Sequence, residues 1–191
     1  EVGAFLDAYE DEGLPGRQVH GVPIAGGLNL LERALDSGYE RFIVSIGENH
    51  VREQVTDRGL AAGLTLDRII SPAAVVGREV QIGPGSMISS GVVLVSGSSI
   101  GRGVILNTSC TIDHDDRIGD FAHICPGAHL AGNVEVGHRS MVGIGASVIQ
   151  GVRIGHDVII GAETARHLTG DARQESLGRV DSVVSLVDHK A

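Results

Sequence analysis

The chain has 191 residues, enough for one domain or two small ones, and it carries a net charge of −9 at pH 7. Phosphate neutralisation needs grouped Lys and Arg, and the sequence holds no basic cluster, so we expect no nucleic acid partner. No apolar run reaches the length of a transmembrane helix, and the first residues do not resemble a signal peptide, so we expect no membrane contact.

The segment before the repeat, 1–69, predicts a small α/β domain with strands over Val2–Leu6 and Arg41–Ile46 and helical spacing over Leu28–Leu35 and Val51–Leu64. Strands that alternate with helices favour a parallel sheet, which binds its ligands at the carboxyl ends of the strands. Asp7, Gly47 and Asn49 follow the two strands and are candidate ligand contacts. In the alternative, Asp7 is a turn residue and Asn49 a helix cap.

A six-residue repeat begins at Ile70 and continues to Gly161. Its first positions are all β-branched or Leu: Ile70, Val76, Ile82, Ile88, Leu94, Ile100, Leu106, Ile112, Ile118, Ile124, Leu130, Val136, Val142, Val148, Ile154 and Ile160. The fifth positions are small or slim, apart from Asp116. A period of six fits neither a helix nor a plain sheet, but it fits a coil of three short strands. The repeat therefore predicts a triangular prism of parallel strands, the hexapeptide-repeat β-helix, with both positions pointing inward.

A second, longer period of three hexads marks one full coil. An aliphatic-Gly pair recurs at Ile82-Gly83, Ile100-Gly101, Ile118-Gly119, Val136-Gly137 and Ile154-Gly155. We expect these glycines to sit at tight corners with unusual φ values. Cys110 and Cys125 fall on different sides of the predicted prism, so we expect no disulfide and a cytoplasmic location.

His114 is the candidate catalytic residue. It occupies an outward third position, flanked by Asp113, Asp115 and Asp116, and one coil later Gly132 offers no side chain to crowd it. A carboxylate neighbour raises the pKa of an imidazole and holds its tautomer, which are the requirements for a general base. The alternative is a solvated surface histidine.

Other histidines leave a zinc site open as an alternative. His123 and His129 occupy outward sixth positions, and His138 and His156 stack one coil apart. His123 and His129 are one hexad apart and therefore lie on neighbouring sides of the prism. We expect no metal, and we interpret His138 and His156 as ordinary corner residues.

Several motifs together resemble one enzyme family. Residues 103–115 read Gly-Val-Ile-Leu-Asn-Thr-Ser-Cys-Thr-Ile-Asp-His-Asp, followed by Ile-Gly-Asp-Phe-Ala-His over 118–123, Pro-Gly-Ala over 126–128 and Ala-Gly-Asn-Val over 131–134. This pattern is similar to the NeuD/PglD family of sugar O- and N-acetyltransferases over about Val2 to Ala162. The family joins a nucleotide-sugar domain to a left-handed β-helix and works as trimers on acetyl-CoA.

The resemblance implies roles for individual residues. His114 would be the base that deprotonates the acceptor, and Asp115 would orient it. The acetyl-CoA groove between adjacent chains would be lined by His123, Gly132, Ile144 and Gly145. The acceptor would be flanked by Asn107, and the nucleotide-sugar contacts would include Asp7, Gly47 and Asn49.

The sequence departs from the family pattern at its two ends. The opening strand and glycine-rich loop have no counterpart, which suggests a truncated α/β domain that binds the sugar nucleotide weakly. The hexads stop after Ala162, and Arg166 falls where an Ile or Val is expected. We therefore predict three segments: a partial Rossmann-like domain over 1–69, the β-helix over 70–162 and an atypical segment over 163–191.

Asp116 is the third departure, because the family usually has an apolar or Cys side chain at this position. Its phase points the carboxylate into the prism, one coil after Ser98. A buried carboxylate needs a hydrogen bond or a raised pKa, and we expect a bond to Ser98 or to a trapped water. Replacing Asp116 by Val should then stabilise the fold.

The sequence thus predicts an acetyltransferase that transfers the acetyl group of acetyl-CoA to the amino group of a nucleotide-linked amino sugar, as a homotrimer and without a metal. Within enzymes, the alternative is O-acetylation of a sugar or small alcohol. Outside enzymes, it is a trimeric β-helix scaffold or zinc protein.

Overall fold

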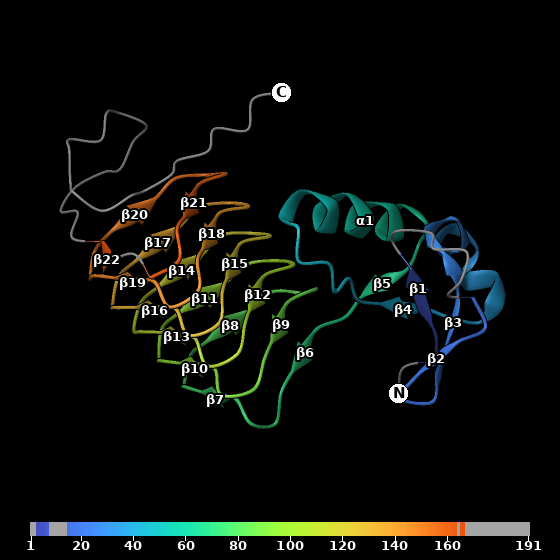
Figure 1. Cartoon of the computed structure of the whole chain (residues 1–191), viewed down its shortest axis with the longest axis horizontal. Coiled ribbons are helices and arrows are strands. Elements are labelled where there is room, and N and C mark those ends of the chain that lie inside the picture. The colour runs from blue at the N-terminus through green and yellow to red at the C-terminus, as the bar shows by residue number, and fades with distance from the viewer. Residues whose placement is uncertain (1–2, 8–14, 164, 167–191) are drawn as a thin grey trace. The chain divides into compact units, whose positions relative to one another are not determined.

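The computed structural model describes residues 3–7, 15–163 and 165–166 (Figure 1). Its contacts divide the chain into two compact units. The small unit consists of Glu1–Ile43 and Gln54–Asp67, and the prism unit consists of Val44–Glu53 and Arg68–Ala191. The segment Val44–Glu53, which contains the first turn of the long helix, thus belongs with the prism.

The small unit contains two short sheets. In the first, β1 (Phe5–Asp7) pairs in parallel with β3 (Val22–Gly27), which pairs antiparallel with β2 (Gln18–Val19). In the second, β4 (Arg41–Phe42) pairs in parallel with β5 (Thr65–Leu66). The helical elements are η1 (Leu28–Arg33), η2 (Leu35–Ser37) and α1 (Asn49–Ala61).

Two expectations for this region are corrected. The helical pattern over residues 28–35 forms 3₁₀ turns rather than an α-helix, and Gly38 ends the second turn in the left-handed conformation at φ 82°. The strand expected over residues 41–46 ends at Phe42, and β4 lies in a different sheet from β1. Gly47 therefore does not directly follow a strand. Asp7 ends β1, as predicted.

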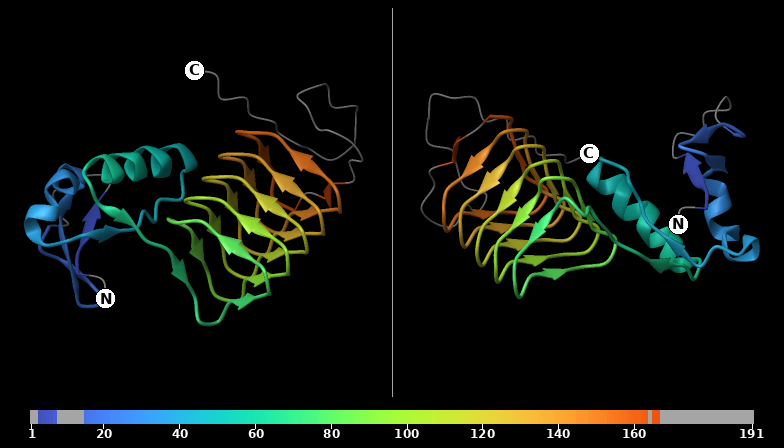
Figure 2. Two further views of the ribbon diagram at one scale, coloured as in Figure 1. Left: turned by 180° about the vertical axis from the view of Figure 1, so that it is seen from behind. Right: turned by 90° about the horizontal axis from the view of Figure 1, so that it is seen from below.

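The repeat folds as a left-handed parallel β-helix of three sheets, here named by their first strands (Figure 2). The β6 face contains β6 (Ile69–Ile70), β9 (Met87–Ile88), β12 (Ile105–Leu106), β15 (His123–Ile124), β18 (Met141–Val142) and β21 (Ile159–Ile160). The β7 face contains β7 (Val75–Val76), β10 (Val93–Leu94), β13 (Thr111–Ile112), β16 (His129–Leu130), β19 (Ser147–Val148) and β22 (Ala165–Arg166). The β8 face contains β8 (Gln81–Ile82), β11 (Ser99–Ile100), β14 (Arg117–Ile118), β17 (Glu135–Val136) and β20 (Arg153–Ile154). Strand pairing thus continues through Arg166, beyond the end of the hexads in the sequence.

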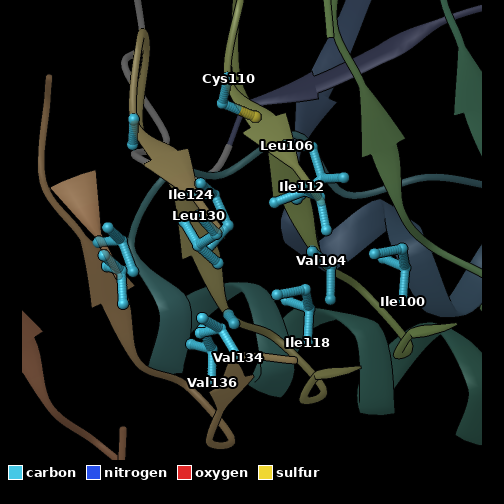
Figure 3. Close-up of a cluster of buried hydrophobic side chains, with 14 of the residues drawn as sticks. Ile100, Val104, Leu106, Cys110, Ile112, Ile118, Ile124, Leu130, Val134 and Val136 are labelled. Carbon is cyan, nitrogen blue, oxygen red and sulfur yellow. The ribbon is translucent and has the colours of Figure 1, made fainter. Parts of the chain in front are cut away.

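The inward positions form a continuous core (Figure 3). First-position residues such as Leu106, Ile112 and Ile124 are fully buried, and so are slim fifth-position residues such as Val104 and Val134. Each strand pairs with the strand one coil away at a register of three hexads, for example Ile112 with Leu130. Stacking like residues in this way buries the aliphatic ladder, as the repeat predicts.

The glycines of the aliphatic-Gly pairs have a different role from the one expected. Positive φ values occur at the fourth position of the hexads, for example Asp115 at 61° and Gly97 at 81°. The paired glycines occupy the second position, where an added Cβ would meet the backbone of the next coil, at 2.6 Å for Gly83 and closer still for Gly137. Close approach of neighbouring coils, and not an unusual φ, requires glycine there.

The described part of the chain contains no helix with the length and apolar character needed to cross a membrane.

Candidate active site

His114 lies on the edge of the prism between the β7 and β8 faces. The corner of residues 113–116 joins β13 to β14. His114 is the third position of its hexad, which points outward. Asp115, the fourth position, adopts a left-handed φ of 61°, which Asp tolerates better than most residues. This conformation places the side chain of Asp115 next to that of His114.

The imidazole of His114 is hydrogen-bonded to Asp115. His114 Nδ1 lies 3.0 Å from Asp115 Oδ2, and both side chains are largely exposed within the single chain. The hydrogen bond that His114 donates to Asp115 raises the pKa of His114, and the charges of Asp113 and Asp116 act in the same direction. Because Nδ1 donates to the carboxylate, the neutral ring has Nε2 free to accept a proton. This is the arrangement that a general base needs.

Two glycines leave room for this pair. An added Cβ at Gly132, one coil further on, would lie 2.5 Å from His114 Nε2. An added Cβ at Gly97, one coil earlier, would lie 2.6 Å from Asp115 Oδ1. The coil period predicts the first contact. Sequence analysis does not single out the second, although the same spacing could have revealed it.

Asp116 points into the prism and is fully buried, as its phase predicts, but its partners are not those expected. Its Oδ1 accepts from the N–H of Val134 at 2.7 Å, and its Oδ2 accepts from the N–H of Asp113 at 3.0 Å. The Ser98 hydroxyl donates instead to the carbonyl groups of Val95 and Asp113. The expected bond to Ser98 is therefore wrong, because two backbone donors bind the carboxylate. Burial raises the pKa of Asp116 to about 7.

Asn107 and His123 form a second cluster of predicted site residues. Asn107 Nδ2 donates to His123 Nε2 at 3.2 Å, which leaves the ring proton on Nδ1. That Nδ1 atom is buried without a hydrogen-bond partner among the residues that the structure describes. Burial, followed by the charge of Arg52, lowers the pKa of His123, and the backbone of Gly47 acts in the opposite direction. The His123 ring is therefore neutral near pH 7.

Ile144 and Gly145 lie on the edge between the β6 and β7 faces, in the corner that joins β18 to β19. Ile144 is 59% exposed and is one of several large aliphatic residues that are exposed in the described part of the chain. Gly145 has a left-handed φ of 66°. Asn107 lies on the same edge, between β12 and β13.

Gly47 and Asn49 lie in the segment that belongs with the prism. Asn49 is buried, and its Nδ2 donates to the carbonyl of Arg139 at 2.7 Å. The helix cap is Glu48 rather than Asn49, because its carboxylate accepts from the N–H groups of His50 and Val51 at 3.0 and 2.8 Å. A sugar-nucleotide contact through Gly47 or Asn49 stays a prediction.

Arg52 is a buried anchor that sequence analysis does not single out. Its guanidinium is fully buried and donates to the carbonyls of Gly103 at 2.8 Å and Phe121 at 2.6 Å, and to Asn49 Oδ1 at 2.7 Å. Burial lowers the pKa of Arg52 to about 10, so it remains charged at neutral pH. Arginine has good helix propensity, so its place in a helix carries no local signal of burial.

The other three histidines considered for a zinc site, His129, His138 and His156, make surface contacts. His129 Nδ1 lies 2.9 Å from the Thr111 hydroxyl, and His138 Nε2 lies 3.1 Å from Glu53 Oε1. His156 Nδ1 accepts from the backbone N–H of His138 at 2.9 Å. Within residues 3–7, 15–163 and 165–166, no three His, Cys, Asp or Glu side chains are grouped so as to hold a metal ion.

The predicted site residues of the prism thus fall into two groups on different edges and faces. His114, Asp115 and Gly132 lie on the edge between the β7 and β8 faces. Asn107, Ile144 and Gly145 lie on the edge between the β6 and β7 faces, and His123 lies on the β6 face. One chain does not bring the two groups together.

The chain is similar to enzymes that acetylate nucleotide-linked amino sugars. No family model matches it. It is 31% identical over 154 residues to GDP-perosamine N-acetyltransferase of Escherichia coli O157:H7, and the match covers 81% of this chain and 68% of that enzyme.

Two solved structures share the fold closely. PerB from Caulobacter crescentus, in complex with CoA and GDP-perosamine, is 37% identical with a TM-score of 0.80, covering 88% of this chain and 77% of PerB. PerB variants in which a histidine is replaced by asparagine or alanine have also been solved with both ligands. The acetyltransferase domain of PglB from Neisseria gonorrhoeae is 36% identical with a TM-score of 0.80, covering 90% of this chain and 80% of that domain. From this identity and coverage, the chain belongs to the NeuD/PglD-like family of sugar acetyltransferases, which are acyl-CoA-dependent enzymes.

Proposed function

We propose that this chain transfers an acetyl group from acetyl-CoA to the amino group of a nucleotide-linked amino sugar, with GDP-perosamine as the first candidate acceptor. The observation that carries the proposal is the His114–Asp115 pair, whose imidazole has Nε2 free for a proton and lies against Gly132. Two of the relatives named above support this acceptor: the Escherichia coli relative is a GDP-perosamine N-acetyltransferase, and PerB holds GDP-perosamine together with CoA.

In the proposed mechanism His114 acts as the general base. Its Nε2 accepts a proton from the acceptor amine as the nitrogen attacks the thioester carbonyl carbon of acetyl-CoA. The carbonyl oxygen becomes an oxyanion, which backbone N–H groups of the groove stabilise. When the carbon–sulfur bond breaks, the CoA thiolate leaves and takes up the proton from the His114 imidazolium. Asp115 stabilises that imidazolium and holds the ring in the required tautomer.

We propose further that the active enzyme is a homotrimer in which neighbouring chains complete each site. The supporting observation is that His114 and His123 lie on different parts of the prism, so a groove containing both needs two chains.

The three faces also differ in the side chains that they expose. The β8 face carries Arg117, Glu135 and Arg153, whereas the large exposed aliphatic side chains Ile69, Val75 and Ile144 lie on the other two faces or on their shared edge.

In this arrangement His123, Ile144 and Gly145 of one chain line the acetyl-CoA groove opposite His114 and Gly132 of its neighbour. The His123 ring is neutral, so it lines the groove without placing a second positive charge beside the base. Asn107 holds that ring in place and flanks the acceptor. Asp7, Gly47 and Asn49 remain the proposed contacts of the sugar nucleotide.

The test is thiol release from acetyl-CoA with GDP-perosamine, a UDP-linked amino sugar and a matched sugar nucleotide that has a hydroxyl in place of the amine. We expect release with at least one amino sugar and none with the hydroxyl analogue. The His114→Ala variant should lose about 10²–10⁴-fold in kcat and still bind CoA. Release with the hydroxyl analogue alone would favour O-acetylation, and full activity of His114→Ala would overturn the mechanism.

A further inference from the structure

The corner that carries His114 breaks a hydrogen-bond pattern that the other corners between Ser71 and Gly143 keep. In that pattern the N–H of the second hexad position donates to the first-position carbonyl one coil further on. Examples are Asn107 to Ile124 at 2.9 Å, Gly119 to Val136 at 2.7 Å and Ala131 to Val148 at 2.9 Å. Asp113 is the second-position residue beside His114, and this pattern would pair its N–H with the carbonyl of Leu130.

The Asp113 N–H donates to Oδ2 of Asp116 at 3.0 Å instead. The side chain of Asp113 in turn accepts from the N–H of His114 at 2.7 Å. The backbone N–H groups of Asp113 and His114 thus both donate to carboxylates. The carboxylate of Asp116 is fully buried beneath the corner. Asp116 therefore binds the backbone N–H of the residue that precedes His114.

The second oxygen of Asp116 connects this corner to the next coil. Asp116 Oδ1 accepts from the N–H of Val134 at 2.7 Å, and Val134 follows Gly132 by two positions. Gly132 is the residue against which the His114 ring lies. The Asp116 carboxylate therefore links the coil that carries His114 to the next coil, which contains Gly132.

At two positions that share the hexad phase of Asp116, a serine makes only half of this bridge. The hydroxyls of Ser86 and Ser140 accept from the N–H groups of Val104 and Val158, one coil further on, at 3.1 and 3.0 Å. Both hydroxyls donate to a second-position carbonyl of the next coil, at 2.8 and 2.6 Å. In those coils the second-position N–H groups of Gly83 and Gly137 keep their ordinary carbonyl partners. A carboxylate, with two acceptor atoms, holds both donors.

We infer that Asp116 is a positioning residue for His114: it draws the Asp113 N–H away from the coil-to-coil pattern and so sets the distance and angle between His114 and Gly132. The inference rests on the proposed function, because it gives His114 a task that requires this geometry. Asp116 itself is buried and does not touch the substrate. It acts through the backbone of Asp113 and Val134.

The experiment compares Asp116→Ser with Ser86→Ala. Asp116→Ser should reproduce the arrangement of Ser86 and Ser140, keep the Val134 bond and let the Asp113 N–H return to the Leu130 carbonyl, so the variant should fold. Ser86→Ala removes the equivalent bond to Val104 at a corner that carries no predicted site residue.

We expect Asp116→Ser to lower kcat by about 10-fold or more while the KM for acetyl-CoA changes by less than about 2-fold, because small misplacements of a catalytic group are costly. Ser86→Ala should keep the wild-type kcat.

A second readout needs no substrate. The imidazole ¹⁵N resonances of His114, assigned with His114→Ala, report its pKa in each variant. Removing the Asp116 charge should lower the pKa of His114, whose other neighbouring charges, Asp113 and Asp115, are unchanged. Wild-type kcat in Asp116→Ser, or a loss no larger than that of Ser86→Ala, would overturn the inference. If the wild type acetylates no amino sugar, the proposed function fails, and an unchanged His114 titration then overturns the positioning role separately.

Discussion

The imidazole of His114 lies against the backbone of Gly132, so close that an added Cβ at position 132 would be 2.5 Å from both Cε1 and Nε2 of the ring. The φ of Gly132 is not positive, so its backbone conformation does not itself require glycine. The requirement comes from the His114 side chain, which occupies the space where a Cβ would be.

Replacing Gly132 by Ala should therefore affect catalysis more than folding. The His114 ring is exposed and can move away from the new methyl group, so the melting temperature should change little. The displaced Nε2 should lower kcat by about 10–100-fold. Gly21→Ala is the contrasting variant: Gly21 has a φ of 82° and open space around it, so this change should cost about 1 kcal/mol of stability and leave kcat unchanged. Wild-type kcat in Gly132→Ala would show that His114 does not need the gap.

The pH dependence of the rate should report the His114–Asp115 bond. The base must be neutral, so activity falls as the pH drops through the pKa of His114. Asp115 raises that pKa by stabilising the imidazolium. In Asp115→Asn the acidic limb of the kcat profile should move to lower pH, and the plateau should fall by less than in His114→Ala. A profile measured across the neutral range checks both points, and an acidic limb that moves to higher pH would contradict the assignment.

The stability of the prism should fall as the pH rises toward neutrality, because of Asp116. Its folded pKa of about 7 lies above the ordinary value of 3.8, so the folded state binds more protons than the unfolded state between these values. The free energy of unfolding should then decrease by up to a few kcal/mol between about pH 4 and pH 7. Urea unfolding of the wild type and Asp116→Ser across this range measures the difference, and equal slopes would argue against a buried, titrating carboxylate.

Asp116→Val completes that titration series, and the backbone bonds of Asp116 now lead us to expect the opposite of the stabilisation predicted from the sequence. At about pH 5 Asp116 is mostly protonated and can still accept from the N–H of Val134, which valine cannot do. Leaving that buried N–H unpaired should lower the free energy of unfolding by about 1–3 kcal/mol. A higher melting temperature for Asp116→Val in acidic buffer would restore the original expectation.

Arg52 and Arg58 lie on the same helix and make a matched pair for stability measurements. Arg52 is buried with several carbonyl acceptors, whereas Arg58 forms a half-exposed ion pair with Glu32 at 2.6 Å. Arg52→Met should destabilise the protein by about 2–4 kcal/mol, because it leaves buried carbonyl groups without donors. Arg58→Met should cost less than about 1 kcal/mol. Similar losses for the two variants in urea unfolding would contradict the role of Arg52 as an anchor.

The proposed trimer can be tested with two substitutions in one coil. Val93 points outward on the β7 face and Ser99 points outward on the neighbouring β8 face. Light scattering should show a trimer for the wild type and for Ser99→Glu, and smaller species for Val93→Glu, because a carboxylate at position 93 would be desolvated in the proposed interface. A wild-type protein that remains monomeric at micromolar concentration would reject the trimer and the two-chain site.

The β-helix, the inward phase of its first and fifth positions and the approach of Gly132 to His114 are all readable from the sequence. Each of these follows from the period of one hexad or of three, and a periodic coil translates sequence spacing directly into spatial neighbours. The inward position of Asp116 and the outward position of His114 were predictable for the same reason. The family could also be recognised, because its motif surrounds that histidine.

How individual polar groups are satisfied emerges only from the folded coils. The partners of Asp116 are backbone N–H groups, which nearly every residue type shares and no sequence pattern reveals. The burial of Arg52 depends on carbonyl groups more than 50 positions away in the chain. The second-position glycines are required by the approach of a neighbouring coil and not by their own φ. Periodicity specifies which residues are neighbours, whereas hydrogen-bond partners depend on distances and directions that exist only once the coils are stacked.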